Sequence, residues 1–122
     1  MKIESIKDLS VYNTSYELAT KIFEITKMLP REEMYSLIDQ IRRSSRSVPM
    51  NIREGFAKRK YKQVYIRHLI DALGSAEETR GWLEISRDCN YISNETQFDL
   101  DKEFDHLCAS LSKLIKSWEN FK

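Results

Sequence analysis

Glycine, proline and cysteine are all scarce in this chain, and each scarcity excludes a class of structure. Three glycines and two prolines in 122 residues are too few for a turn-rich all-β fold and suit long helices. Cys89 and Cys108 do not form a CxxC motif, so we expect two reduced thiols. No apolar run reaches transmembrane length, and the first residues contain no signal-peptide core. We therefore expect a cytoplasmic protein that does not associate with membranes.

Sequence signals of catalysis or metal binding are equally sparse. His68 and His106 lack nearby His, Cys or carboxylate partners in the sequence, which favours ordinary structural histidines over metal ligands. The three glycines are scattered, so they form no phosphate-binding loop. The Glu-x-x-His element of di-metal helix bundles is absent, and the third helical segment's carboxylates suit a solvated face (Glu77, Glu78, Glu84). We expect no enzymatic activity, no metal and no cofactor.

The remaining composition indicates one globular domain over residues 1–122. Hydrophobic residues make up 41% and charged residues 32% of the chain, and the length is enough to bury one core. Apolar residues recur at helical spacing in four segments. The fourth segment has the most regular spacing, alternating 4 and 3 (Leu100, Phe104, Leu107, Leu111, Leu114, Trp118, Phe121). Four amphipathic helices with short connections predict an all-α, antiparallel up-down four-helix bundle.

Local signals place the ends of these helices. Asp8 is expected to cap the first helix and Pro30 to end it. A second helix is predicted over residues 31–58, and its apolar stripe keeps its phase across Pro49, so we expect one continuous helix with a kink there. A third helix is predicted over about residues 61–89. Asn94 and Gln97 resemble a capping box that opens the fourth helix.

Positive charge is concentrated in the middle of the chain. The formal net charge is +1, but residues 42–67 carry nine Lys or Arg residues against Glu54 alone, a balance of +8. Residues 1–41 have a balance of −2 and residues 68–122 a balance of −5. A near-neutral protein with one strongly basic segment has a polarised surface, and such a surface attracts polyanions.

Helical phase predicts that part of this charge forms a stripe. At 100° per residue with Ile41 at zero, three arginines fall between about 100° and 140°, beside the buried face. The stripe is predicted to continue into the following turn, giving seven candidate nucleic-acid-binding residues (Arg42, Arg46, Arg53, Lys58, Arg59, Lys60, Lys62). Tyr61 and Tyr65 lie among them and are candidates for stacking on bases. The alternative is an ordinary solvated basic face with the tyrosines in the core.

A second set of residues lies on outward faces of the middle helices. Glycine inside a helix costs about 1 kcal/mol relative to alanine, so glycines on an outer helix face suggest close approach by another subunit. The predicted subunit interface comprises six residues (Arg43, Asn51, Glu54, Gly74, Glu78, Gly81). The alternative is that these glycines are simply tolerated on the surface.

The same segments carry a family resemblance over about residues 9–91. The run Pro30-x-x-Glu33-x-Tyr35-x-Leu37-x-x-Gln40-Ile41-Arg42-Arg43 is followed by Ser47-Val48-Pro49-x-Asn51-Ile52-x-Glu54-Gly55 and by Gly74-Ser75-x-x-Glu78. This pattern resembles the four-helix bundle proteins encoded in intervening sequences of bacterial 23S ribosomal RNA genes. It is also similar to the accessory variability proteins of diversity-generating retroelements.

The resemblance implies a non-catalytic four-helix bundle that assembles as a ring-like homo-oligomer, a pentamer. It also implies a positively charged surface for nucleic acid and, in the retroelement branch, for a reverse transcriptase. Arg46 and Arg53 depart from the family pattern, where a small residue is expected, and each adds charge. Two functions therefore stay open. The first is an oligomer that binds nucleic acid, with RNA favoured over DNA, and the second is a scaffold that docks an acidic partner protein.

Overall fold

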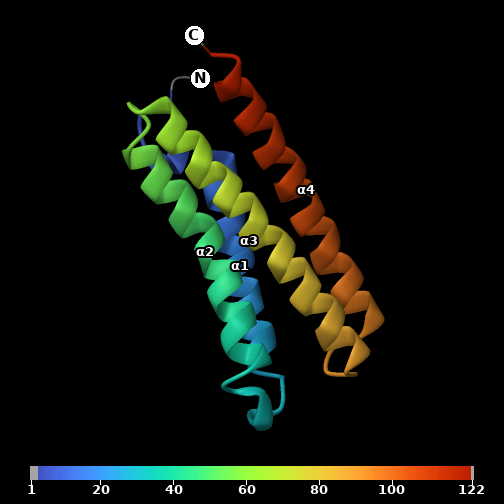
Figure 1. The fold of residues 1–122 in the computed structure, drawn as a ribbon. Coiled ribbons are helices and arrows are strands. Elements are labelled where there is room, and N and C mark those ends of the chain that lie inside the picture. The colour runs from blue at the N-terminus through green and yellow to red at the C-terminus, as the bar shows by residue number, and fades with distance from the viewer. Residues whose placement is uncertain (1–2, 122) are drawn as a thin grey trace.

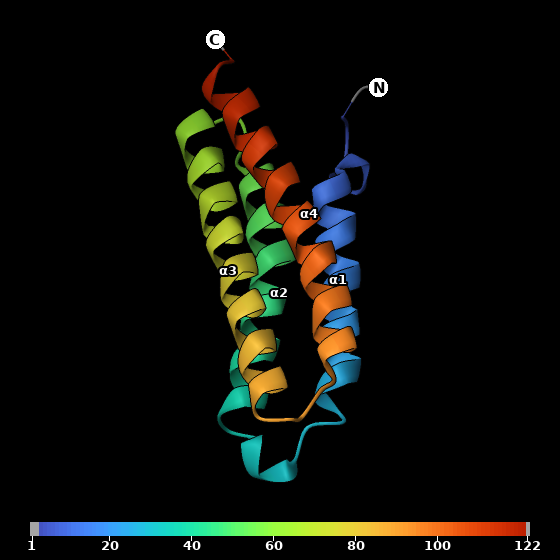
Figure 2. The same ribbon diagram turned by 90° about the vertical axis from the view of Figure 1, so that its right-hand side faces the viewer.

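The computed structural model describes residues 3–121, and this part of the chain contains helices and no strand. The four long helices are α1 (Ser10–Thr26), α2 (Leu37–Ala57), α3 (Lys62–Asp88) and α4 (Asn94–Glu119). Two short 3-10 helices, η1 (Ile6–Asp8) and η2 (Arg31–Glu33), precede α1 and α2. The chain reverses direction at each connection between long helices, so α1 begins and α4 ends at the same end of the bundle (Figures 1 and 2). The predicted all-α four-helix bundle is confirmed.

The core lies along the axis shared by the four helices, and each helix contributes residues at the spacing that the sequence predicts. Leu18 and Ile22 of α1, Leu69 of α3 and Leu111 of α4 are 1% exposed or less. Phe121, the last seam residue listed above, and Met34, the first apolar residue of the predicted second helix, lie outside this core. Met34 is 39% exposed because it precedes the start of α2, and Phe121 is 63% exposed because α4 ends at Glu119.

The first and fourth helices begin differently from the prediction. The Asp8 carboxylate accepts hydrogen bonds from the backbone N–H groups of Glu4 and Ser5, so it completes a capping box with Ser5 at the start of η1 and does not cap α1. Ser93 caps α4 by accepting from the Thr96 N–H at 3.0 Å. The expected capping box fails because Gln97 is buried, where its carbonyl accepts from Arg87 at 2.9 Å.

The second helix begins at Leu37, six residues later than predicted, because the chain first makes the turn η2. The Glu33 carboxylate lies ahead of the helix and accepts from the Leu37 N–H and the Ser36 hydroxyl. It also accepts from the Tyr91 hydroxyl at 2.8 Å, which joins this turn to the α3–α4 loop. These bonds, from Ser36 first and then Tyr91, hold the pKa of Glu33 below its usual value.

Pro49 lies inside α2, and the helix runs without interruption from Leu37 to Ala57. The predicted continuity across this proline is confirmed. Its side chain is buried among the apolar residues of the stripe, which include Val48 and Ile52, both fully shielded from solvent. The bend that proline causes, through its missing N–H and its contact with the carbonyl four residues earlier, stays a prediction.

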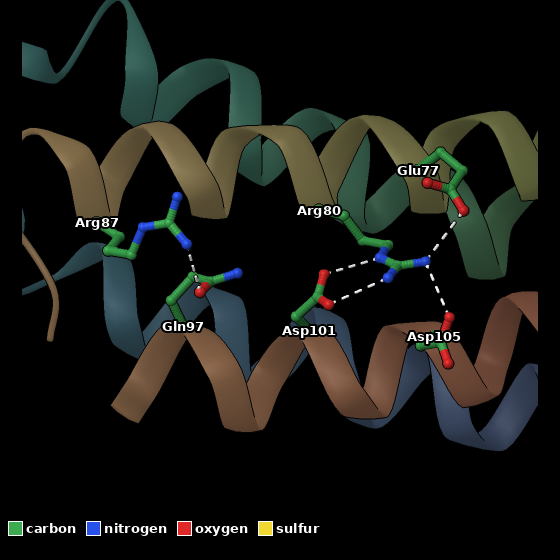
Figure 3. Close-up of polar contacts among 6 residues, drawn as sticks. All are labelled: Glu77, Arg80, Arg87, Gln97, Asp101 and Asp105. Carbon is green, nitrogen blue, oxygen red and sulfur yellow. Dashed lines mark hydrogen bonds and ion pairs between the residues drawn. The ribbon is translucent and has the colours of Figure 1, made fainter. Parts of the chain in front are cut away.

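A charged cluster joins α3 to α4 away from the basic segment. The Arg80 guanidinium donates to both carboxylate oxygens of Asp101, at 2.8 and 3.1 Å (Figure 3). Glu77 and Asp105 lie 3.2 and 3.3 Å from the same guanidinium. Two-point contact with a carboxylate fixes orientation as well as charge, so this cluster sets how α3 and α4 align.

Candidate nucleic-acid interface

Three arginines of α2 lie against aromatic rings of α1. The guanidinium carbons of Arg42 and Arg46 lie 4.8 and 5.5 Å from the centre of the Phe23 ring, and that of Arg53 lies 5.7 Å from the centre of the Tyr12 ring. Cations within about 6 Å of a ring centre are attracted to its face. The arginines predicted to share one flank of α2 therefore do share it, and we call Arg42, Arg46 and Arg53 the arginine row.

Each arginine of the row keeps hydrogen-bond donors that the protein does not use. Arg42 donates from Nε to the Thr26 hydroxyl at 2.8 Å, and Arg53 donates from Nη1 to the Tyr12 hydroxyl at 2.9 Å. Within residues 3–121, Arg46 is exposed and contacts only the Phe23 ring among charged or aromatic partners. A guanidinium has five N–H donors in a planar fork that matches phosphate geometry, so most of them stay available to a ligand.

Two surface hollows lie along the arginine row and meet at Tyr16. The Arg46 hollow has a volume of about 350 Å³ (Tyr16, Ala19, Thr20, Phe23, Arg46, Pro49, Met50). The Arg53 hollow has a volume of about 640 Å³ (Lys7, Tyr12, Asn13, Tyr16, Glu17, Arg53). The first is mainly apolar and the second more polar, and each contains one arginine of the row. The α1–α2 groove, formed by these two hollows, is therefore basic with an aromatic residue at its middle.

The basic turn after α2 does not continue this row. Lys58 lies on the opposite flank of α2, where its Nζ is 2.9 Å from Glu54. Arg59 folds back onto its own helix end, with its guanidinium carbon 3.8 Å from the centre of the Phe56 ring. Lys62 donates to the Glu119 and Phe121 carbonyls at the end of α4. Of the turn residues, Lys60 is the one that is exposed without a described hydrogen bond or ion pair in residues 3–121.

The two tyrosines near this turn have different environments. Tyr61 is 63% exposed, so it remains open to a ligand. Tyr65 is 1% exposed and packs edge-on against Trp118, with ring centres 4.7 Å apart. Burial raises the pKa of Tyr65 to about 12. The prediction that Tyr65 stacks on bases is therefore wrong, because its place in the apolar seam of α3 buries the ring.

The predicted interface residues divide into open and occupied positions. A Cβ added at Gly74 or Gly81 would meet no atom within 4 Å, and Arg43 is exposed. Glu78 accepts instead from the Trp82 indole N–H at 2.9 Å. Glu54 pairs with Lys58 and lies 3.8 Å from His68.

Asn51 was expected to point outward, and the structure places it between α2 and α3. Its amide oxygen lies 3.2 Å from Nδ1 of His68, and its amide nitrogen donates to the Ser47 hydroxyl. The hydroxyls of Ser47 and Ser75 lie 2.9 Å apart. These contacts form because α2 and α3 approach closely at Gly55, where an added Cβ would lie 2.6 Å from the His68 Cβ. Asn51 therefore holds two helices of one chain together.

Tyr16 is the member of the groove that sequence reasoning missed. With Ile22 at zero and 100° per residue, Tyr12, Tyr16 and Phe23 fall between about 80° and 120° on α1. Their common phase, at the edge of the buried stripe, to which Tyr12 still belongs, was the available signal. It became meaningful only with the packing of α1 on α2, which places these rings beside the arginine row.

The described residues meet neither the requirements of a metal site nor those of a membrane span. Within residues 3–121, no three His, Cys, Asp or Glu side chains are close enough to hold a metal ion. None of the helices described in this range is both long and apolar enough to cross a bilayer. Cys89 is exposed, Cys108 is buried, and both are free thiols.

Comparisons with known proteins agree on one family. The family model for the 23S rRNA-intervening sequence protein matches residues 7–113. A solved structure from Bacteroides thetaiotaomicron, described as a protein of unknown function from the S23 ribosomal protein family, has 31% sequence identity and a TM-score of 0.79. The similarity covers 87% of this chain and 98% of that one. The comparison with curated proteins finds no match.

Proposed function

The chain belongs to the family of 23S rRNA-intervening sequence proteins, and we propose that it binds RNA through the arginine row without catalysing a reaction. The observation that carries this proposal is the alignment of Arg42, Arg46 and Arg53 on aromatic rings of α1. Two of these residues occur where the family pattern favours small side chains. They add exposed charge to the flank of α2 that faces α1.

The aromatic support favours phosphate binding for a physical reason. An arginine held against a ring has lost much of its side-chain freedom before a ligand arrives, so less entropy is lost on binding. Contact with a ring uses none of the five N–H donors of a guanidinium, so these stay free for hydrogen bonds to a ligand. Three such groups on one helix flank offer a short row of phosphate contacts.

RNA is favoured over DNA by the names of the relatives. The family carries the name 23S rRNA-intervening sequence protein, and the solved neighbour is assigned to the S23 ribosomal protein family. Neither name denotes a catalytic activity. The groove contains few side chains that could read base edges, so we expect binding that depends on the backbone and varies little with sequence.

A charge-reversal pair tests the site. Arg46→Glu with Arg53→Glu lowers the formal net charge from +1 to −3, since each reversal removes two charges. Lys102→Glu with Lys113→Glu, two exposed positions on α4, makes the same change elsewhere. Fluorescence anisotropy with a labelled RNA should show strong loss for the first pair and a small loss for the second. Equal losses would mean that net charge alone matters and would contradict a site in the groove.

A docking scaffold for an acidic protein is the second candidate, and the same basic face supports it. This candidate predicts that the wild-type protein shows no salt-sensitive RNA binding but binds an acidic polypeptide. It also predicts that reversing Arg46 and Arg53 abolishes binding to that polypeptide. The arginine row would then serve a protein partner, and the RNA proposal would be withdrawn.

We also propose that the protein self-associates through the outer face of α3, as a ring such as the pentamer that the family resemblance implies. Gly74 and Gly81 are open there, and Ile70 and Ile85 on the same side of the helix are 49% and 45% exposed. Apolar side chains beside glycines allow another backbone to approach closely. Repeating the arginine row in each subunit would multiply phosphate contacts.

A further inference from the structure

Tyr16 is an aromatic residue exposed on a rigid helix beside the arginine row. Its side chain is 55% exposed, whereas Tyr12, one helical turn earlier, is 5% exposed. The centres of the two rings lie 5.9 Å apart and their planes are tilted by 52°, so the Tyr16 ring packs against the buried Tyr12 ring. One side of the Tyr16 ring therefore has a partner in the protein and much of the rest faces solvent.

The surroundings of Tyr16 fit a nucleotide. The Arg46 hollow presents mainly apolar surface, including Ala19 and Met50, which suits the face of a base. The Arg53 hollow also has Tyr16 in its lining and presents more polar groups. Arg46 and Arg53 are seven residues apart, roughly 10.5 Å along the helix axis at 1.5 Å per residue. The tyrosine thus stands between two cationic groups that could each hold a phosphate.

Two other exposed aromatic residues, Phe98 and Tyr35, lack this combination. Phe98 is 63% exposed and has the Lys102 Nζ 5.9 Å from its ring centre, but it lies on α4, in the part of the chain with a net negative charge. Tyr35 is 94% exposed, but it lies in the turn before α2 rather than between arginines. The Glu17 carboxylate of α1 also lines the Arg53 hollow. It repels a phosphate, so a phosphate in this hollow would lie closer to Arg53 than to Glu17.

We propose that Tyr16 stacks on an unpaired base of bound RNA while Arg46 and Arg53 hold phosphates on either side. This inference rests on the proposed function and makes it more specific, because it names single-stranded RNA as the ligand. Bases inside a duplex are already stacked on their neighbours and cannot lie on a tyrosine without opening the helix. Stacking on an aromatic ring tolerates any base, which agrees with weak sequence preference.

The test compares single-stranded and double-stranded RNA of equal length, both labelled and measured by anisotropy. Tyr16→Ala should weaken binding to the single strand by about five- to 150-fold, the range for one lost base stack. Binding to the duplex should change by less than about twofold. Tyr16→Phe keeps the ring and should keep most of the single-strand affinity. Phe98→Ala removes a ring of similar exposure elsewhere and should leave both affinities unchanged.

Three results would overturn this inference. The first is that Tyr16→Ala weakens single strand and duplex equally, which indicates a general loss of the surface. The second is unchanged affinity in Tyr16→Ala while the Arg46 and Arg53 reversals still abolish binding, in which case the proposed function stands and stacking does not. The third is an absence of salt-sensitive RNA binding by the wild type, which removes both. Circular dichroism of each variant confirms that the helices persist.

Discussion

Replacing Gly55 with alanine tests how closely α2 approaches α3. The added Cβ would lie 2.6 Å from the Cβ of His68 and 3.1 Å from the Tyr65 ring. Both Cβ atoms are bonded directly to helix backbones, so no side-chain rotation can separate them. The two helices would have to move apart, and the contacts of Asn51 with His68 would lengthen with them.

The expected cost follows from two opposing effects. Overpacking a tight core position costs about 1–3 kcal/mol, and a clash between two backbone-bound atoms belongs at the upper end. Alanine in place of a helical glycine stabilises the folded state by about 1 kcal/mol, which offsets part of this cost. The net loss should be about 2 kcal/mol. With a urea dependence of about 1–3 kcal/mol per molar, the unfolding midpoint should fall by roughly 1 M.

Gly74→Ala is the matched control, because the same substitution there meets no atom within 4 Å. It should stabilise the isolated chain by about 1 kcal/mol through helix propensity alone. Both variants should be unfolded at a protein concentration where light scattering gives a monomer mass, since assembly would add to stability. A Gly55→Ala variant as stable as wild type, or more stable, would refute the close α2–α3 approach.

Two further predictions concern the turn before α2 and the outer face of α3. The pKa of Glu33 is lowered in the folded protein, so the Glu33 carboxylate stabilises the fold above the usual pKa of 4.5, and this stabilisation is lost as pH falls through the folded pKa. Glu33→Gln should therefore flatten the decline of the unfolding free energy below about pH 4.5. An unchanged decline would contradict this role of Glu33. Gly74→Leu with Gly81→Leu should shift the assembly toward monomer in light scattering while far-UV helicity persists, and an unchanged assembly mass would exclude that interface.

The helices and their buried faces were predictable from the sequence because each apolar stripe repeats many times. Leu100, Phe104, Leu107 and Leu111 are all buried as their spacing predicts. Helix starts were less predictable, since each depends on one or two polar contacts. Ser93 and Asn94 are both good capping residues, and Ser93 caps the helix while Gln97 accepts a hydrogen bond from Arg87 of α3.

The candidate site was predictable only in part, for a related reason. Phase alone placed Arg42, Arg46 and Arg53 on one flank of α2, because all three lie within one regular helix. Lys58 was placed with them because it is near in sequence, and its pairing with Glu54 puts it on the other flank. The role of Tyr16 depends on which helix packs against α2, and a single helix's pattern carries no such information.

The most direct test of RNA binding through the arginine row is the salt dependence of wild-type affinity. For a single strand, log K falls against log salt with a slope of about −0.7 per phosphate neutralised, so three arginines predict a slope of about −2 for each subunit. The variant with Arg46 and Arg53 reversed to glutamate should bind RNA too weakly to show a salt slope as steep as that of the wild type. A wild-type affinity that does not change with salt, or a reversed variant with the wild-type slope, would contradict binding through this row.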